Sequence, residues 1–469
     1  MEDGSLDSFE GGKLWKPENI FLVFAIFFGL LFSFVQPLFN EPDSSYHFDH
    51  AMYISNTVVD RSAIGFSGED YQSQPIAFTK VSDLKADGTY FKNFFETKLP
   101  LIHKKDADPR ASRGYGTKWD LTWYNDVMHI VPGLGVKLGY AIYPSIGSMV
   151  LTARVFSLIF FVLSMFFIIK QLRAYQFLFV AISVTPTVIQ QASSLSYDVY
   201  NYVASAFMIM AVINIAVDIK CGSEVSFKSF FLRILAPSVM LYFAKENAQL
   251  IYLSLPFIFI YLLGKRFGFK LSKLQSALGV LILIAMGTGL FYFMFSDQLF
   301  LIAKKMFYSL IEPYYTVLTT EVISGTTTAA LPAWFFPIQF TVLILLFLSY
   351  TKEVVSRWFA WGALSLVLLN FLVIMVSYAI DPGFIDYAGR IITGPQGRYF
   401  TPFLLLLGPV FTLIAKKITV KSGPALIHLL VVMSVFALLL NLGITSIKFY
   451  QLQLPADEWR SGIHHYIFK

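Results

Sequence analysis

Residues 18–38 read ENIFLVFAIFFGLLFSFVQPL, and the chain continues over residues 39–50 as FNEPDSSYHFDH. The first stretch holds about 20 mostly apolar residues, the length that an α-helix needs to cross the hydrocarbon core of a bilayer. It is too long for the apolar region of a signal peptide, and no small-residue cleavage pattern follows it. We therefore expect it to remain in the protein as a first membrane span.

The composition of the whole chain agrees with this beginning. Of the 469 residues, 56% are hydrophobic and only 14% are charged, whereas a soluble domain carries about 25% charged residues. The formal charge of +6 is scattered in short clusters between apolar runs, a pattern that indicates membrane topology and not a nucleic-acid partner. The single Cys221 permits no internal disulfide. The composition predicts an all-α polytopic membrane protein.

Runs of the length of a membrane helix recur along the chain, and we count about eleven. They cover residues 18–38, 149–169, 175–192, 199–218, 230–244, 248–263, 275–295, 333–350, 358–380, 398–415 and 424–446. Residues 18–446 thus form one transmembrane domain between an N-terminal segment, 1–17, and a C-terminal tail, 447–469. The longer connections are a large first loop at 39–148, a second at 296–332 and a short one at 381–397.

The basic residues predict the orientation of these spans. Short loops on one side hold most of them, including Lys265, Arg266, Lys416 and Lys417, and the connections on the other side hold few after the first long loop. Because Lys and Arg gather in cytoplasmic loops, we expect a cytoplasmic N-terminus. The long loops and the C-terminal tail are then extracytoplasmic.

The first polar cluster on the outer side follows the first span directly. Asp43 comes after a proline and before a run with helical periodicity, so it is a candidate N-cap of a helix at the membrane surface. Asp43, His47 and His50 are spaced i, i+4 and i+7, which places them on one face of that helix. A carboxylate and two imidazoles on one face could form a base with its positioning partners or a metal site; a helix cap beside two solvated histidines is the alternative.

Four further clusters fall on the same side, and an amphipathic helix at the membrane interface fully explains the one in the loop 296–332, which includes Lys304, Lys305 and Glu321. A Ser-rich turn that includes Ser196 ends in Asp198, where a helix N-cap is the alternative interpretation. Lys245 and Glu246 lie at the tip of a short hairpin, and such residues usually face a protein-lined cavity when they occur at membrane depth. A Gly-Pro-Gln-Gly turn precedes Arg398 at the mouth of a late span, and simple snorkelling of that arginine would need no rigid turn. The adjoining candidate residues of this turn are Gln396 and Tyr399.

A carboxylate near a helix start and cationic residues at other outer helix mouths favour a site for an anionic lipid, such as a lipid phosphate. Arg398 and Lys245 are the candidates that bind the phosphate, because Arg binds phosphate through two parallel charge-assisted hydrogen bonds. If the phosphate carries a sugar, Asp43 can take the proton of an acceptor hydroxyl while the lipid phosphate leaves. Direct displacement of this kind inverts the anomeric configuration. Glu41, His47, His50, Ser196, Asp198, Glu246, Gln396 and Tyr399 are the candidates for acceptor binding or site organisation.

Three motifs together resemble a known group of proteins. They are Pro42-Asp43-x-x-x-His47-Phe48, Ser194-x-Ser196-Tyr197-Asp198 and Gln396-Gly397-Arg398-Tyr399-x-x-Pro402. In span order and motifs the chain resembles a bacterial family of predicted polytopic membrane proteins, a domain of unknown function in the GT-C glycosyltransferase superfamily. Members commonly carry Asp-Glu in the first motif, where this chain has Asp43 and Ser44.

The resemblance implies a GT-C-like bundle with a large first extracytoplasmic loop that carries the catalytic acid, in the bacterial cytoplasmic membrane. It also implies a polyprenyl-phosphate-linked sugar as donor, with Asp43 in the catalytic place and Arg398 at the donor phosphate. The acceptor would be a cell-surface glycan or glycolipid. A divalent metal bound by His47, Asp49 and His50 is an alternative that we do not favour, and no other cofactor is expected. The competing functions are a transporter or flippase of a lipid-linked saccharide and a non-catalytic accessory subunit of an envelope complex.

Overall fold

Helices make up nearly all of the chain that the computed structural model describes. The described residues are 16–39, 41, 44–61, 64, 88–102, 123–268, 298–311, 321–325, 331–332, 334–350, 354–380, 391–392, 394–414 and 423–447. No strand is formed among them, and an isolated bridge joins Val59 to Leu101. The predicted all-α class is therefore confirmed for this part of the chain.

Six helical stretches in the described residues are long and apolar enough to cross a membrane. They are α1 (Pro17–Val35), α6 (Ile146–Gln171), α9 (Asp198–Lys220), the continuous stretch Glu246–Arg266, α17 (Arg357–Ile380) and α19 (Gly423–Ser446). The stretch Glu246–Arg266 consists of α11 (Glu246–Gln249), η7 (Leu250–Leu253) and α12 (Ser254–Arg266). Each corresponds to one of the apolar runs in the sequence.

The predicted count of about eleven spans is not confirmed, because several of the other runs form shorter or broken helices. The run 175–192 is divided into α7 (Gln176–Ser183) and α8 (Pro186–Ala192), where a proline without an N–H begins the second helix. α10 (Phe227–Tyr242) and α16 (Phe335–Tyr350) have 16 residues each. The run 398–415 forms the 3-10 helices η10 (Gly397–Tyr399) and η11 (Thr401–Leu406), followed by α18 (Leu407–Phe411). The run 275–295 lies outside the described residues.

The predicted first loop, 39–148, contains helices of its own. These are α2 (Ser44–Ser55), α4 (Gly88–Phe91), the π-helix η5 (Lys92–Glu96) and α5 (Trp123–Ile142). The sequence did not predict α5 as a span, because Pro132 and Lys137 interrupt its apolar residues. The second predicted loop, 296–332, likewise contains α14 (Leu299–Ile311).

α5 packs very closely against α6. A Cβ atom added to Gly135 would lie 2.5 Å from Cα of Ala153, and one added to Gly139 would lie 2.5 Å from the carbonyl oxygen of Ser148. Small residues four apart allow two helix backbones to approach in this way. The hairpin of α5 and α6 therefore ties the helices of the first loop to the bundle.

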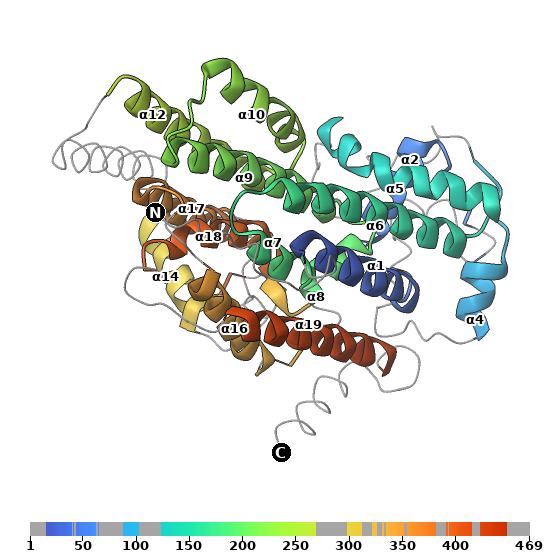
Figure 1. The fold of residues 1–469 in the computed structure, drawn as a ribbon. Coiled ribbons are helices and arrows are strands. Elements are labelled where there is room, and N and C mark those ends of the chain that lie inside the picture. Colours follow the sequence, from blue (N-terminus) through green and yellow to red (C-terminus); the bar gives the residue numbers. More distant parts are fainter. Residues whose placement is uncertain are drawn as a thin grey trace.

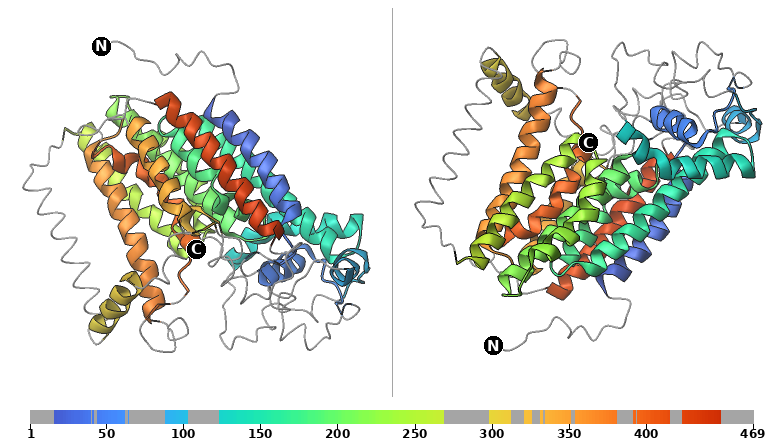
Figure 2. Two further views of the ribbon diagram at one scale, coloured as in Figure 1. Left: turned by 90° about the horizontal axis from the view of Figure 1, so that it is seen from below. Right: turned by 90° about the horizontal axis from the view of Figure 1, so that it is seen from above.

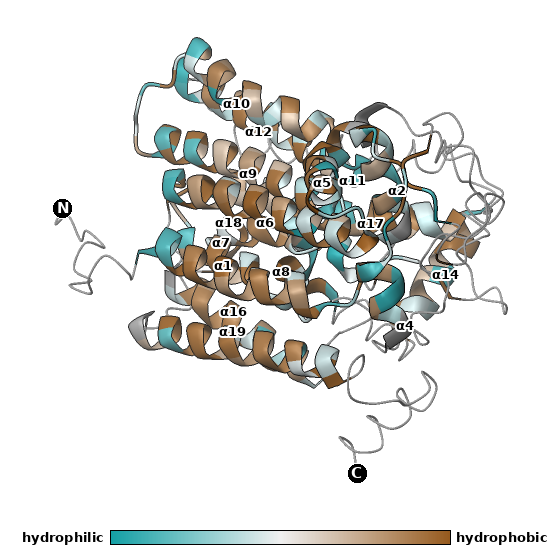
Figure 3. Ribbon diagram, turned by 90° about the vertical axis from the view of Figure 1, so that its right-hand side faces the viewer, coloured by the Kyte–Doolittle hydropathy of each residue, from teal (hydrophilic) through white to brown (hydrophobic). Residues whose placement is uncertain are grey.

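The helices are arranged around α9. In the apolar stretch of α9, 89% is buried inside the protein, whereas 28–50% is buried in the other five long stretches. α1, α6, α9 and α19 run side by side, and α2, α4 and α5 gather at the end of the bundle where α1 ends (Figures 1 and 2). Hydrophobic residues cover the length of the bundle, and hydrophilic residues collect at its ends (Figure 3). This distribution is that of a protein that spans a bilayer.

Candidate functional site

Three charged side chains from separate segments meet at the first residue of α9. Oδ1 of Asp198 accepts a hydrogen bond of 2.5 Å from Nζ of Lys245, and its Oδ2 lies 2.8 Å from Nε of Arg398. The side chains of Asp198, Lys245 and Arg398 are 9%, 20% and 3% exposed. Two cations and one carboxylate give this ion triad a net charge of +1 in a largely buried place.

Local turns hold Asp198 and Lys245 in position. The hydroxyl of Ser194 donates to the carbonyl of Gln191, and the backbone N–H of Asp198 donates to the hydroxyl of Ser196 at 3.1 Å. Ser196 thus shapes the turn before α9. Asp198 is not the N-cap that the alternative interpretation expected, because Tyr197 holds that position without a side-chain cap and the Asp198 carboxylate pairs with the two cations. The backbone N–H of Lys245 donates to Oδ1 of Asn201, one turn into α9, at 2.7 Å. The tip of the hairpin between α10 and α11 is thereby fixed to the start of α9.

A second set of hydrogen bonds fixes the backbone around Arg398. The N–H of Gly397 donates to Oε2 of Glu321 at 3.2 Å, and the hydroxyl of Thr401 donates to the carbonyl of Val322 at 2.7 Å. The N–H of Tyr399 donates to the carbonyl of Gln396, so Gln396 begins the 3-10 turn. Glu321, which the sequence analysis placed in the interfacial cluster of the loop 296–332, is 1% exposed. It therefore acts on the arginine turn from a distant part of the sequence.

Two tyrosines surround the ammonium group of Lys245. Its Nζ lies 4.3 Å from the ring centroid of Tyr197 and 4.7 Å from that of Tyr399, within the range of cation–π attraction. The guanidinium of Arg398 lies 5.4 Å from the Tyr399 ring. Burial raises the pKa of the Tyr399 hydroxyl far above its ordinary value, so this side chain stays neutral. Tyr399 therefore contributes an aromatic face beside the two cations.

Three imidazole rings form a second cluster. Nδ1 of His47 lies 2.9 Å from Nε2 of His129, and the ring of His50 stacks on His129 with centroids 4.8 Å apart. His47 and His50 share one face of α2, as their spacing predicted, and His129 comes from α5. We did not identify His129 from the sequence, because a lone histidine in an apolar segment carries no signal. Burial, followed by the charge of His129, holds the pKa of His47 well below its ordinary value.

Tyr197 joins the imidazole cluster to the ion triad. Its ring lies 4.6 Å from that of His47 and 5.5 Å from that of His129, and the ammonium of Lys245 lies 4.3 Å from its centroid. The charges of Asp198, Lys245 and Arg398 also act on the pKa of His47. The two clusters therefore form one polar site at this end of the bundle.

Glu41 lies in a different place, in a buried ion pair with Arg154 of α6. Nη2 of Arg154 donates to Oε2 of Glu41 at 2.6 Å, and the same guanidinium donates to the carbonyls of Gln36 and Pro37 at 2.6 and 2.7 Å. The Arg154 side chain is fully buried. This pair fixes the connection between α1 and α2, on which Asp43 lies. The sequence analysis did not single out Arg154, although an arginine inside an apolar run is a signal for such a pair, since these residues are rare unless they have a partner.

The remaining candidates differ in what the structure shows. Asp43 lies outside the described residues, and α2 begins at the next residue, Ser44. Glu246 is exposed beside Lys245. Oε1 of Gln396 is buried and has no hydrogen-bond partner among the described residues. Within the same residues, no group of three His, Cys, Asp or Glu side chains is arranged to hold a metal ion.

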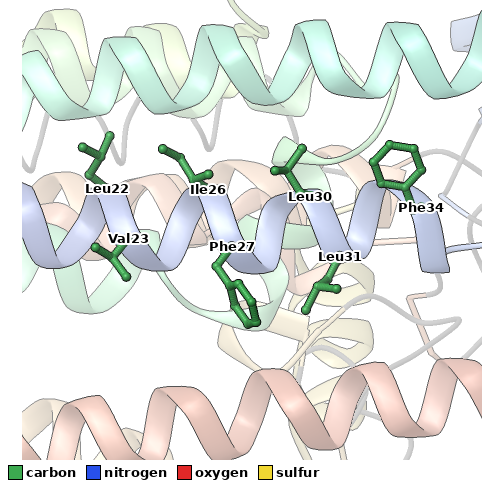
Figure 4. Close-up of a pocket in the computed structure, with 7 residues that line it drawn as sticks. All are labelled: Leu22, Val23, Ile26, Phe27, Leu30, Leu31 and Phe34. Atoms are coloured by element: carbon green, nitrogen blue, oxygen red, sulfur yellow. The ribbon is translucent and has the colours of Figure 1, made fainter.

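An apolar groove runs along α1, apart from the polar site. Its volume is about 510 Å³, and Figure 4 shows the side chains that line it. They are Leu22, Val23, Ile26, Phe27, Leu30, Leu31 and Phe34. Because all of them are hydrocarbon side chains, the groove offers no group for chemistry, and the ion triad with the imidazole cluster remains the candidate functional site.

Fold and site together define a helical membrane protein with a buried, charged site at one end of its bundle. Residues 26–407 match the family model described as "Predicted membrane protein (DUF2142)". Since this match covers well over half of the chain, the protein belongs to that family. No curated protein and no solved structure matches the chain. This match confirms the predicted resemblance to a family of membrane proteins of unknown function.

Proposed function

We propose that this protein is a GT-C-type membrane glycosyltransferase that moves a sugar from a polyprenyl-phosphate-linked donor to a cell-surface glycan or glycolipid. The observation that carries the proposal is the ion triad of Asp198, Lys245 and Arg398 beside three buried histidines. A sugar joined to a lipid through one phosphate is a phosphodiester with one negative charge. The net charge of +1 on the triad is complementary to it.

Arg398 and Lys245 are the groups that suit the leaving phosphate. A guanidinium has five N–H donors, and an ammonium has three. As the bond between the anomeric carbon and the phosphate breaks, the phosphate takes the electron pair, and fixed cations stabilise the charge that develops. Asp198 is suited to positioning and not to proton abstraction, because its two oxygens are engaged by the two cations.

Asp43 is the proposed general base. It directly precedes α2, whose residues His47 and His50 belong to the site. In the reaction, the acceptor oxygen forms a bond to the anomeric carbon from the face opposite the phosphate, and the Asp43 carboxylate takes the acceptor proton. The product has the inverted configuration. The Arg154–Glu41 pair supports this role because it holds the segment between α1 and α2.

We also propose that the site opens on the outer face of the bacterial cytoplasmic membrane. The support is the distribution of basic residues about α9. Arg173 and Arg233 both pair with Asp218, near the end of α9 remote from Asp198, and Lys220 follows there. Because basic residues favour the cytoplasmic side, that end is the inner one. The N-terminus would then be cytoplasmic.

The test is the composition of the surface glycan, by mass spectrometry, in cells that lack this protein. Cells complemented with the native chain should regain a missing sugar, and cells with equally expressed Asp43→Asn should not. Glu224→Gln, which alters an exposed carboxylate at the opposite end of α9, is the matched control and should restore the sugar. Equal restoration by Asp43→Asn would contradict the role of Asp43 as base.

A second experiment separates the transferase from a flippase. Purified protein in detergent has no two membrane sides, so a flippase would convert nothing there. The transferase should release polyprenyl phosphate from a synthetic polyprenyl-phosphate hexose when purified envelope glycan is added. Restoration of the sugar in cells, without release of polyprenyl phosphate in detergent, would favour the flippase.

A further inference from the structure

Two arginines and a carboxylate meet at the end of α9 that is remote from the ion triad. Oδ1 of Asp218 accepts a hydrogen bond from Nη1 of Arg173, and its Oδ2 accepts one of 2.5 Å from Nη1 of Arg233. The Asp218 side chain is 4% exposed, whereas those of Arg173 and Arg233 are 50% and 38% exposed. One buried carboxylate therefore holds two guanidinium groups, here called the arginine pair, at the surface of the bundle.

The arginine pair comes from two segments that flank α9. α6 and α10 both pack against α9, and Figure 3 shows α9 between them, with hydrophilic residues at the same end of all three. Arg173 follows α6, and its backbone N–H donates to Oδ1 of Asn214, one turn before Asp218, at 2.8 Å. Nδ2 of Asn214 donates to the carbonyl of Gln171 at 3.0 Å. The backbone and the side chain of Arg173 are thus both fixed to α9.

The outward faces of α6 and α10 are apolar next to the arginine pair. Exposed apolar side chains recur there at every fourth residue, namely Ile159, Leu163 and Phe167 of α6 and Phe231, Leu235 and Val239 of α10. In a bundle that spans a membrane, such faces contact acyl chains. Arg173 follows the α6 row, and Arg233 lies between Phe231 and Leu235 in the sequence. The pair therefore lies where acyl chains give way to headgroups, a depth that long basic side chains reach.

We propose that the arginine pair binds the headgroup phosphate of an anionic phospholipid in the leaflet at this end of the bundle. The pair and Asp218 carry a net charge of +1, and the phosphodiester of a phospholipid carries one negative charge. Each guanidinium has five N–H donors, and Asp218 is bound by Nη1 in both arginines. The half-exposed remainder of each fork suits a phosphate, which Arg binds through two parallel hydrogen bonds. Basic residues between membrane helices bind anionic headgroups in this way.

The neighbouring charges favour an anionic lipid. Lys170, Lys220 and Lys228 are exposed on α6, α9 and α10 at the same end, and Glu224 adds one exposed carboxylate. This excess of positive charge attracts anionic headgroups, and the apolar rows beside the pair would contact the acyl chains that a free anion lacks. Because the site lies at the opposite end from the ion triad, it does not depend on the proposed sugar transfer.

The first test is a titration of the purified protein in a neutral detergent with phosphatidylglycerol, measured by native mass spectrometry. We expect Arg173→Gln and Arg233→Gln each to weaken binding about tenfold, the loss of a hydrogen bond to a charged group. Lys228→Gln removes the same charge from another exposed position of α10 and should weaken binding by less than about twofold. Equal effects of all three variants, or none from either arginine variant, would overturn the site.

Two further ligands separate the sources of the phosphate. Phosphatidylcholine has the same phosphodiester but no net charge, so it should bind more weakly than phosphatidylglycerol. Inorganic phosphate has no acyl chains and should not displace phosphatidylglycerol when it is added in excess. Displacement by inorganic phosphate would indicate a site for a free anion, and equal binding of phosphatidylcholine would indicate a site for acyl chains alone. Either result would overturn the proposal.

A measurement on the unmodified chain does not depend on how variants fold. Phosphatidylglycerol with a photoreactive diazirine in its headgroup is reconstituted with the native protein in nanodiscs made mainly of phosphatidylcholine. Crosslinks should form at the segment after α6 that contains Arg173 and at the part of α10 around Arg233, and unlabelled phosphatidylglycerol should suppress them. Crosslinks without preference for these two segments would overturn the site, and the proposed sugar transfer would stand.

Discussion

The two ends of α9 carry the same arrangement of charges in two different settings. At one end, Asp198 pairs with Lys245 and Arg398, whose side chains are 20% and 3% exposed. At the other end, Asp218 pairs with Arg173 and Arg233, whose side chains are 50% and 38% exposed. In both cases one buried carboxylate meets two cations from other segments.

The difference lies in what the cations can do. Arg173 and Arg233 reach water, so their pairing with Asp218 contributes little energy and mainly marks the end of the bundle. Lys245 and Arg398 are largely buried, and two tyrosine rings lie beside the Lys245 ammonium. Their backbone is fixed where Asn201 accepts a hydrogen bond from the N–H of Lys245 and Glu321 accepts one from the N–H of Gly397. Burying a charge is costly unless it is paired. The two cations have one carboxylate between them, and the proposed anionic donor would be their second negative partner.

The largest effect expected from this comparison is on stability. Asp198→Asn would leave Lys245 and Arg398 buried without their carboxylate, and removing one partner of a buried pair costs about 3–5 kcal/mol. Asp218→Asn should cost about 1 kcal/mol, because its two arginines are solvated. Reversible unfolding in mixed detergent micelles measures both. Equal losses for the two variants would show that the burial of the cations does not distinguish the two ends.

The next effect is on activity. Arg398→Lys keeps the charge and loses the planar fork that fits a phosphate, and we expect donor turnover to fall about 100-fold, the loss seen when one donor to a developing oxyanion is removed. Arg233→Lys makes the same exchange at the other end and should change turnover less than twofold. The assay is release of polyprenyl phosphate by purified, folded protein. Near-native turnover of Arg398→Lys would remove this residue from the donor site.

The histidines extend the comparison to pH. The pKa of His47 is lowered in the folded protein, chiefly by burial, whereas in the unfolded chain it returns to about 6.5. The unfolded state therefore binds the proton more readily. The contribution of His47 to stability is complete above about pH 6.5 and is lost as the pH falls below that value, by at most about 1.4 kcal/mol per pH unit.

Variants of two histidines isolate this contribution. His47→Gln should flatten the fall of the unfolding free energy between about pH 6.5 and 5, a range set by the ordinary histidine pKa. His428→Gln, on the exposed side of α19, should leave the slope unchanged. An unchanged slope for His47→Gln would mean that folding does not lower the pKa of His47.

The sequence predicted the class of fold and most of the charged residues of the site, and six of its eleven expected spans correspond to long apolar helices. Lys245, Asp198 and Arg398 were recognised separately, each at an end of an apolar run on the same predicted side, and topology alone places such ends near one another. The structure adds which of them meet. Three-dimensional contact could not be inferred for His129, because α5 was hidden in the predicted loop 39–148. Nor could the pairing of Glu321 with the Gly397 amide be inferred, because 76 residues separate the two.

The smallest perturbation tests which side of the membrane each end of α9 faces. Cys221 is exposed at the end of α9 near Asp218, and Lys92 is exposed on η5, which packs beside the start of α6 at the site end. Lys92→Cys in a Cys221→Ser background changes two exposed positions, and such surface changes usually alter stability by less than about 0.5 kcal/mol. A small membrane-impermeant maleimide should label Lys92→Cys in intact cells and should label native Cys221 only after permeabilisation. The reverse pattern would place the ion triad on the cytoplasmic side. The cationic site would then face nucleotide-linked donors, and lipid-linked donors of the outer leaflet would lie on the other side of the membrane. The proposed glycosyl transfer at the outer surface would be wrong, although the paired charges at the two ends of α9 would stand.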